Sequence, residues 1–555
     1  MSSSRPPVVA PNGVVAAAHP LAAVAGLRML LAGGNAVDAA VATAAALNVV
    51  EPYMSGIGGD GYLMVSLADG TRRGLDYVGR SPKGARPELY KDDYRRLIKG
   101  PLAPLVPGNC GGWLTALETH GTMDRATVFA PAIAYAEEGF PLSPKNATFI
   151  EPSLASMDED GRRNIAPLGR APRAGERITQ PELARTFRAL VEGGAEAFYR
   201  GPIAEAICAD VQRRGGVLST EDMAAFRAEW VEPIGVGYRG RDIYTLPPPC
   251  CGVQYLETLN LLEGFDLAAM GHGSADHLHA LAECIKIAVA DRTTYVGRED
   301  APVAGLISKA YARRRRAEID PGRARPSRGD RWVRYEDPAA IKAGDPAALS
   351  HEQTTSFSVI DRWGNGVSVT QSLGGGFGSG VCAGGTGVFL NNFCWWFDLD
   401  PQSPAAIAGG RKLTMCVSPC HVWQEGRLAV AIGTPGGYGI LQTTPQMLVN
   451  LIDFGMNTQE AIEAPRFRCV TPIAETDVYF TSERPMASTG GLGIMIEGRY
   501  SDAALAELER RGHRVERLAE WTSAVGGGHG VAIDPTSGAR VGGADPRRDG
   551  AAVGY

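Results

Sequence analysis

Residues 354–372, TTSFSVIDRWGNGVSVTQS, restrict the fold more than any other segment of the chain. Polar and apolar residues alternate in both halves of this segment, and the turn-forming residues DRWGN separate the halves. Alternation with a period of two is typical of β-strands, and a short turn containing Asp, Gly and Asn is typical of a hairpin. The segment therefore predicts two antiparallel strands, the first of which begins at Thr354.

The stretch before this hairpin, residues 314–353, has a different character. It is charged, rich in proline and poor in apolar periodicity. Such a composition predicts a flexible surface linker. Asp and Glu residues interleave with its arginines, which argues against a nucleic-acid-binding patch.

The first part of the chain predicts helices followed by strands. Two Ala-rich helices are expected within residues 19–50, separated at Gly33 and Gly34, and Asn35 is the expected cap of the second helix. A strand pair is expected within residues 62–78, and the stretch from about residue 85 to 345 is expected to be mostly helical.

The C-terminal part predicts a mixture of both element types. The expected elements are a hairpin within residues 421–433, helices within 445–455 and 502–512, and a final strand with Gly-rich loops within 530–555.

Bulk composition excludes several functional classes. A chain of 555 residues fits two to four domains or one large layered unit. It is 44% hydrophobic and 21% charged, as is usual for globular proteins, and its formal net charge of -6 gives no electrostatic signal for nucleic acid or an anionic membrane. The longest apolar stretch, residues 36–50, is too short to cross a bilayer, and the first 20 residues lack the apolar core of a secretory signal. A cytoplasmic protein is predicted.

Two patterns that imitate ligand sites are rejected. Gly56, Gly58 and Gly61 fit G-x-G-x-x-G, but a helix precedes them and a strand follows, which is the reverse of the dinucleotide-binding order. His277 and His279 are two positions apart on a predicted helix and therefore point in different directions. The ten cysteines lack paired spacing, so no metal site, disulfide framework or cofactor is predicted.

A Thr-Thr pair that opens a strand directly after a linker has a chemical interpretation as well as a structural one. A threonine hydroxyl is a weak nucleophile at neutral pH. When threonine is the first residue of a chain, however, its own α-amine, with a pKa of about 8, can take the hydroxyl proton. One residue then supplies both nucleophile and base. From the residues alone, Thr354 is more simply interpreted as a β-forming residue at a strand start.

Five blocks of the sequence resemble the γ-glutamyltransferase family and follow its order. They are GGNAVDAAVATAAALNVVEPYMSGIGGDG, TTSFSVIDRWGNGVSVTQSLGGGFGSG, GTPGGYGILQTTPQMLVN, AIEAPRFR and GGADPRRDGAAVGY. Because these blocks span almost the whole chain, the protein is identified as a member of that family. The resemblance implies an αββα N-terminal-nucleophile hydrolase fold, in which two stacked sheets lie between layers of helices.

The resemblance also implies a precursor that is cut into two associated subunits. The cut would fall between Gln353 and Thr354. Residues 1–353 would form the large subunit, which ends in the 314–353 linker, and residues 354–555 would form the small subunit.

The resemblance carries over four catalytic positions. Thr354 matches the family nucleophile, and Ser372 matches a threonine that is hydrogen-bonded to that nucleophile. Gly436 and Gly437 match the pair whose backbone N–H groups hold the oxyanion, where the absence of a side chain allows close backbone approach.

Substrate-binding positions depart from the family pattern. The family arginine for the γ-glutamyl carboxylate aligns with Val78. Arg80 lies two residues away and is either a replacement guanidinium or a solvated strand-end residue. Asn392 is kept, whereas Trp396 replaces an acidic residue that holds the substrate amine, and Cys416 replaces one of a serine pair.

An ammonium group beside Phe393 and Trp396 would lose charge-assisted partners worth about 1.5 to 3 kcal/mol each, which favours a different acyl group. Alternatively, the aromatic residues belong to the core and Asp398 and Asp400 supply the anion, which leaves glutamyl specificity open.

The leading hypothesis from the sequence is therefore a self-processed threonine hydrolase or transferase acting on γ-glutamyl amides such as glutathione. Water, an amino acid or a peptide would be the acceptor, and no nucleic acid or membrane partner is expected. The alternative is an amidohydrolase or acylase that takes a non-glutamyl acyl group. A third hypothesis, an inactive scaffold, conflicts with the intact Thr354, Gly436 and Gly437.

Overall fold

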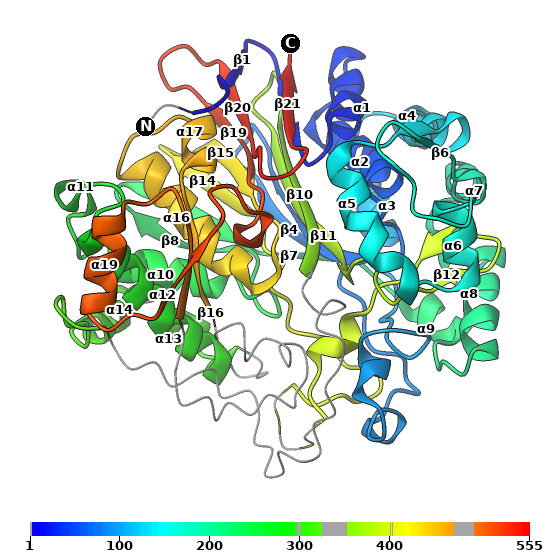
Figure 1. Cartoon of the computed structure of the whole chain (residues 1–555). Helices are drawn as coiled ribbons and strands as arrows, with labels where there is room; N and C mark the ends of the chain where they lie inside the picture. Colours follow the sequence, from blue (N-terminus) through cyan, green and yellow to red (C-terminus); the bar gives the residue numbers. More distant parts are fainter. Residues whose placement is uncertain are drawn as a thin grey trace.

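A computed structural model describes residues 3–296, 301–324, 352–399, 401, 403, 405–470 and 493–555 (Figure 1). Two seven-stranded sheets lie at the centre of the molecule, and helices cover the outer side of each sheet. This arrangement is the αββα sandwich, and the predicted fold class is confirmed.

The first sheet has the strand order β21-β2-β10-β11-β3-β4-β7. In sequence order its strands are β2 (Val14–Ala17), β3 (Asp60–Ser66), β4 (Arg72–Asp76), β7 (Glu229–Val231), β10 (Glu352–Ile360), β11 (Gly366–Gly375) and β21 (Ala551–Gly554). All neighbouring strands in it are antiparallel. The predicted hairpin, β10 and β11, therefore lies in the middle of a large sheet rather than at its edge.

The second sheet has the strand order β1-β20-β19-β15-β14-β9-β8. Its strands are β1 (Val8–Ala10), β8 (Ile234–Tyr238), β9 (Arg241–Thr245), β14 (Cys420–Gln424), β15 (Arg427–Gly433), β19 (His529–Ile533) and β20 (Arg540–Ala544). Smaller sheets contain β5 (Phe140–Pro141) with β6 (Arg177–Ile178), β12 (Cys382–Ala383) with β13 (Val388–Phe389), and β16 (Phe467–Val470) with β17 (Gly493–Glu497) and β18 (Val515–Leu518).

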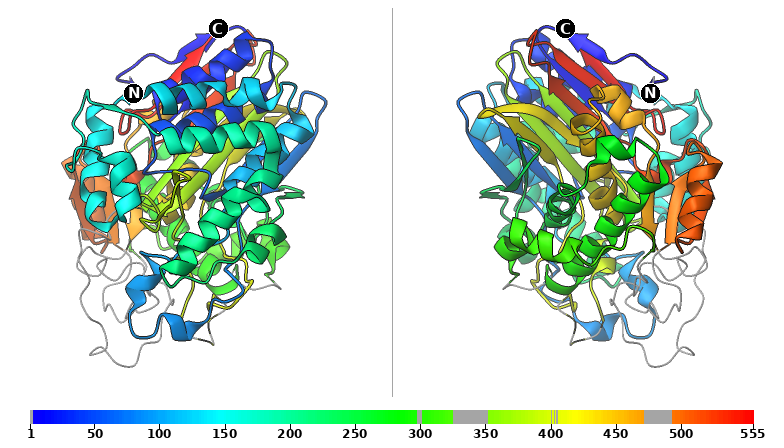
Figure 2. Two further views of the ribbon diagram at one scale, coloured as in Figure 1. Left: turned by 90° about the vertical axis from the view of Figure 1, so that its right-hand side faces the viewer. Right: turned by 90° about the vertical axis from the view of Figure 1, so that its left-hand side faces the viewer.

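One helical layer lies on the side of the first sheet (Figure 2, left view). Its helices are α1 (Pro20–Leu31), α2 (Ala36–Val50), α3 (Asn109–His120), α4 (Arg125–Glu138), α5 (Pro144–Ile150), α6 (Glu159–Ile165), α7 (Pro181–Tyr199), α8 (Pro202–Arg213) and α9 (Thr220–Ala225). The other layer lies on the side of the second sheet and contains α10 (Val253–Leu262), α11 (Leu267–Met270), α12 (Ala275–Tyr295), α13 (Val303–Leu306), α14 (Lys309–Arg316), α16 (Ile440–Ile452), α17 (Thr458–Glu463) and α19 (Asp502–Arg510).

Short 3-10 turns complete the described elements. They are η1 (Pro87–Leu89), η2 (Tyr94–Leu97), η3 (Glu151–Ser156), η5 (Phe393–Trp396), η6 (Gly437–Gly439) and η7 (Ser523–Val525). Within the described residues, no helix combines the length and apolarity needed to cross a membrane.

The Ala-rich N-terminal helices form as the sequence predicts. Asn35 caps α2 by accepting from the backbone N–H groups of Val37 and Asp38, and Asp38 accepts in return from the Asn35 N–H, which completes a capping box. Every residue of α2 is buried. Small residues allow α1 to approach closely, since a Cβ atom at Gly26 would lie 2.3 Å from Thr43 Oγ1. α2 thus covers the outer face of the central hairpin, and α1 packs against α2 and lies over the neighbouring strands β2 and β21.

The central hairpin is buried on both faces. Phe357 and Val359 belong to the apolar core shared with α2, whereas Ser356 and Ser358 alternate with them and point toward the second sheet. The same alternation places the Thr354 side chain on the face between the sheets. Small hydroxyl residues there allow the sheets to approach, because a Cβ atom at Gly433 of β15 would lie 2.4 Å from Ser356 Oγ.

The sequence prediction was incomplete between residues 85 and 345. This stretch is mostly helical where it is described, but it also contributes β7, β8 and β9 to the edges of both large sheets. These strands have only three to five residues, and β8 contains two glycines, so they carry little periodic signal. Of the predicted linker 314–353, residues 325–351 lie outside the described residues.

Candidate active site

Thr354 lies at the buried start of β10, directly opposite Ser372 of β11. Its side chain is almost inaccessible, with 2% of the residue exposed. Thr354 Oγ1 donates to Ser372 Oγ at 3.4 Å, and the Gly374 N–H donates to the same oxygen at 2.7 Å. The two hydroxyls that the sequence singles out are therefore neighbours on the inter-sheet face.

The β10–β11 ladder is irregular at this point. Gln353 pairs with Gly374 and Thr354 pairs with Ser372, so the register shifts between Gln353 and Thr354. Such bulges disrupt a ladder locally and redirect side chains. The irregularity coincides with the peptide bond that the sequence predicts to be cut.

The Gly-rich turn after β15 approaches the same strand. Gly436 has a φ of 128° and Gly437 a φ of 53°. Both values lie in the region where glycine alone is unstrained. Gly437 begins η6, which contacts β10. The structure thus brings the predicted oxyanion turn against the strand that carries Thr354.

Arg80 and Asn392 are engaged elsewhere. The exposed Arg80 side chain donates to the Gly410 carbonyl at 3.3 Å. The buried Asn392 amide accepts from the Gly375 N–H at 2.8 Å and donates to the Ile98 carbonyl at 2.8 Å. These contacts brace backbone segments, and the described part of the chain shows no hydrogen bond from either side chain to Thr354.

Trp396 lies closer to the predicted machinery. It is half-buried in η5, with its ring centroid 5.0 Å from that of Phe393 and 5.9 Å from that of Tyr438. Because Tyr438 directly follows Gly437, this aromatic cluster adjoins the oxyanion turn. Cys416, by contrast, is fully buried in the hydrophobic core. All ten cysteines are described and buried, and none forms a disulfide.

Two residues beside Thr354 were missed by the sequence prediction. Arg548, in the loop between β20 and β21, donates from Nη1 to the Thr354 carbonyl at 3.1 Å. Glu51, at the end of α2, is also buried, and burial raises its pKa to about 7 although the Arg548 charge pulls the pKa down. The available signals were an acidic residue after α2 and two adjacent arginines in the final block, but nothing in the sequence places either near Thr354.

A third polar residue, missed by the sequence prediction, continues the row formed by Thr354 and Ser372 into the next strand of the sheet. Asp60 of β3 lies opposite Ser372 on the side away from Thr354. Its Oδ1 accepts from the Gly79 N–H at 2.9 Å. Burial holds the pKa of this carboxyl well above its ordinary value, although the backbone N–H groups of Gly79 and Gly108 lower it.

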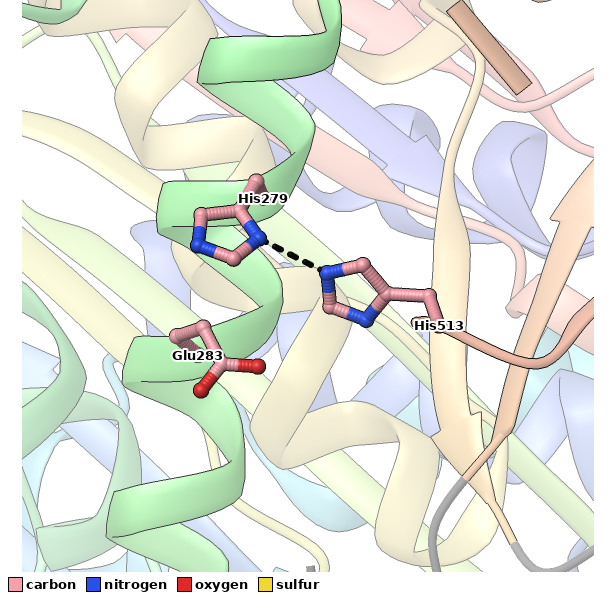
Figure 3. A group of neighbouring side chains, drawn as sticks. All are labelled: His279, Glu283 and His513. Carbon is pink, nitrogen blue, oxygen red and sulfur yellow. Dashed lines mark hydrogen bonds between the residues drawn. The ribbon is translucent and has the colours of Figure 1, made fainter. Parts of the chain in front are cut away.

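Away from Thr354, a cluster of two histidines and one glutamate has the composition of a metal site (Figure 3). His279 and Glu283 of α12 face His513, which precedes β18. Lys286 Nζ, however, lies 2.8 Å from Glu283 Oε1 and 3.2 Å from His513 Nδ1. This ammonium group occupies the position next to two of the three candidate ligands, which disfavours a cation there.

Hydrogen bonds account for the same cluster without an ion. Lys286 donates to His513 Nδ1, so His513 carries its proton on Nε2 and donates to His279 Nδ1 at 2.8 Å (Figure 3). His279 then donates from Nε2 to the Asp320 carbonyl at 2.8 Å. Each ring nitrogen thus has one partner of the right kind. The chain of bonds links residues before the predicted cleavage point with a residue after it.

Comparison with known proteins gives consistent relatives. The family model for gamma-glutamyltranspeptidase matches residues 22–555. Acylase ACY 1 proenzyme of Pseudomonas sp. (strain SE83) is 36% identical over 573 residues, covering 99% of this chain and 94% of that protein. Glutathione hydrolase proenzyme of Escherichia coli (strain K12) is 33% identical over 572 residues, covering 99% and 93%.

Solved structures agree with this assignment. Cephalosporin acylase from Bacillus halodurans superimposes with a TM-score of 0.87 at 33% identity, covering 100% of this chain and 98% of that one. The protein has two facing sheets with helices outside both, and a buried threonine lies near the start of a central strand of one sheet. This is the arrangement of the N-terminal-nucleophile hydrolases. Within that class, this chain belongs to the gamma-glutamyltranspeptidase family of enzymes.

Proposed function

We propose that the chain is a precursor that cleaves itself before Thr354 and then hydrolyses or transfers amide-linked acyl groups through Thr354. The contact between the Thr354 and Ser372 hydroxyls at the register shift carries this proposal. The relatives described above are named as proenzymes, which supports the proposal. Residues 1–353 and 354–555 would then be the two chains of the mature enzyme.

In self-cleavage, Thr354 Oγ attacks the Gln353 carbonyl carbon and the Gln353–Thr354 C–N bond breaks. The acyl group moves to the hydroxyl oxygen, and the hydroxyl proton is taken up by the released α-amine. Water then hydrolyses the ester, which gives a carboxylate at Gln353 and restores the Thr354 hydroxyl. The bulge favours this step because it distorts the ladder at the bond to be broken.

In turnover, the α-amine of Thr354 takes the hydroxyl proton as Oγ attacks the substrate amide carbonyl. The backbone N–H groups of Gly436 and Gly437 would stabilise the oxyanion, since both glycines have a positive φ and the η6 turn that Gly437 begins contacts β10. The amine of the substrate leaves with the proton that the Thr354 α-amine has taken up. Water, an amino acid or a peptide then accepts the acyl group from the ester formed at Thr354. Ser372 would hold the nucleophilic oxygen in place.

Intact-mass measurement and N-terminal sequencing test the cleavage. Wild-type protein is expected as two fragments, one of which begins at Thr354, and Thr354→Ala as a single uncut chain without activity. Thr536→Ala, an exposed threonine in the turn before β20, is the matched control and is expected to be cut normally. Wild-type protein that stays uncut and inactive would refute the proposal.

The aromatic cluster beside the oxyanion turn favours an acyl group without an α-amine. Trp396 and Phe393 offer no anion to a substrate ammonium group, while Arg80 and Asn392 have backbone partners. Loss of one charge-assisted bond of about 1.5 to 3 kcal/mol corresponds to roughly a 10- to 150-fold preference. The second candidate acyl group is γ-glutamyl, which the named glutathione hydrolases support.

Glutaryl and γ-glutamyl p-nitroanilides differ only by the α-amine and therefore separate these candidates. The expected result is a kcat/KM at least tenfold higher for the glutaryl compound, with Trp396→Asp shifting the ratio toward γ-glutamyl. A wild-type preference for the γ-glutamyl compound would decide for the second candidate.

A further inference from the structure

Arg548 has an unusual environment for a buried arginine. It is 7% exposed, and its Nη1 donates to two neutral atoms, the Thr354 carbonyl oxygen at 3.1 Å and Met54 Sδ at 3.4 Å. Within the described residues, its Nε has no hydrogen-bond partner. Burial lowers the pKa of this guanidinium. Such a residue gives little to stability, because the nearby Glu51 carboxylate offsets only part of the cost of burying the charge.

The segment after α2, which contains Tyr53 and Met54, is hydrogen-bonded to β11, the strand that carries Ser372. The Leu373 N–H of β11 donates to the Met54 carbonyl at 3.0 Å, and the Phe377 N–H donates to the Tyr53 carbonyl at 3.1 Å. Glu51 begins this segment. Three parts of the chain therefore meet behind the nucleophile: the segment after α2, the start of β10 and the loop between β20 and β21.

We propose that Arg548, with Glu51 beside it, is a positioning residue that fixes the backbone of Thr354 for self-cleavage and for turnover. Its hydrogen bond holds the carbonyl bonded to the Thr354 Cα, the atom that also carries the α-amine and the side chain. Fixing this carbonyl sets the torsion about the Cα–C bond and so the direction of both reacting groups.

The bond gains importance once the chain is cut. Thr354 then loses its covalent connection to Gln353 and becomes a chain end, and chain ends are poorly ordered unless they are tied down. In the described structure, the ladder to Ser372 and the bond from Arg548 are ties that the cut would leave intact. A displacement of about 1 Å at a reacting group can cost about 100-fold in rate.

The groups that face the pair come from several elements. Arg548 and Asp549 lie in the loop between β20 and β21, Tyr53 follows Glu51, and Lys145 of α5 acts on Asp549. Asp549 is held by the Ser143 hydroxyl. Asp549 thus has its own partner, which leaves Glu51 as the carboxylate beside Arg548.

This inference rests on the proposed function, and its test distinguishes the two. Cleavage of the wild type is measured first. An uncut wild type refutes the proposed function. In a cut wild type, Arg548→Met is expected to slow self-cleavage and to lower kcat by about 10- to 100-fold while KM stays within twofold. Arg548→Lys, which keeps a donor, is expected to recover part of both rates.

Arg540→Met is the matched control. Arg540 also donates to backbone carbonyls, those of Asp361 and Arg362, but at the opposite end of the β10–β11 hairpin. It is expected to cut and turn over like the wild type. A kcat for Arg548→Met within twofold of the wild type, or an equal loss in Arg540→Met, overturns the inference.

If Arg548→Met does not fold, Arg548→Lys decides alone. A kcat lowered several-fold at an unchanged Tm supports positioning, whereas an unchanged kcat at a lowered Tm shows a merely structural role and overturns the inference.

Discussion

Two adjacent arginines, Arg547 and Arg548, are both buried but have opposite surroundings. Arg547 donates to both oxygens of Glu497, at 2.7 and 2.6 Å, and to both oxygens of Asp545, at 3.1 Å. Arg548 donates to a carbonyl and a thioether. Burial lowers the pKa of both, but the carboxylates around Arg547 reverse the shift and raise its pKa, whereas that of Arg548 stays lowered.

The comparison separates an arginine that stabilises the fold, Arg547, from one that we propose to position the nucleophile, Arg548. The Arg547 network joins α17, β17 and the loop after β20, since Arg547 also donates to the Ile462 and Ala464 carbonyls. Removing such a residue leaves buried charges without partners. Arg548 has no such network of carboxylates, and it donates instead to the backbone carbonyl of Thr354, the candidate nucleophile. Three predictions test this contrast, from the largest expected loss of free energy of unfolding to an expected gain.

Arg547→Met is expected to cost about 3 to 5 kcal/mol, because Glu497 and Asp545 would each lose a buried ion-pair partner. Urea unfolding at pH 7 measures the loss, with Arg540→Met as the control. A variant within 1 kcal/mol of the wild type would contradict the structural role of the network.

Asp545→Asn is expected to cost about 2 to 3 kcal/mol at pH 7. Burial disfavours its charge, but Arg547 and Arg466 outweigh burial and hold the pKa of Asp545 below its ordinary value. A lowered carboxyl pKa contributes stability above the unfolded pKa, and this contribution is lost as the pH falls through the folded pKa.

Unfolding measurements between pH 7 and pH 2 test the sign. The gap between wild type and Asp545→Asn is expected to narrow below about pH 4. A gap that stays constant to pH 2 would mean that the Asp545 charge contributes nothing.

Glu51→Gln is expected to raise the free energy of unfolding near neutral pH, with the opposite pH dependence. Burial raises the pKa of Glu51 from 4.5 to about 7, so the folded chain holds this proton more tightly than the unfolded chain. The wild type therefore loses stability as the pH rises from about 4.5 to about 7, and Gln removes that loss.

At pH 8 the Gln variant is expected to be more stable than the wild type by about 3 kcal/mol, while at pH 4 the two should agree. Thermal unfolding at both values measures this. Parallel stability curves for the two proteins would show that Glu51 is not buried as described.

The sequence predicted those parts of the molecule that depend on neighbours along the chain. Asn35 and Asp38 form a capping box within one turn, and the alternation from Thr354 onward gives the central hairpin. The pairing of Thr354 with Ser372 follows from the hairpin register, since 18 positions separate them.

Contacts between distant segments were not predictable in this way. Arg548 is 194 positions from Thr354 and 494 from Met54, and no local pattern encodes such a contact. Arg80 illustrates the same limit, because its distance along the chain from Val78 says nothing about the Gly410 carbonyl that binds it.

The proposed cut before Thr354 would divide the chain without dividing the fold. The first large sheet takes β2, β3, β4 and β7 from residues before the cut and β10, β11 and β21 from residues after it, and β10 lies between β2 and β11. Neither piece holds a complete large sheet or a complete core. The two pieces would therefore stay together after the cut, because each completes the sheets and the core of the other.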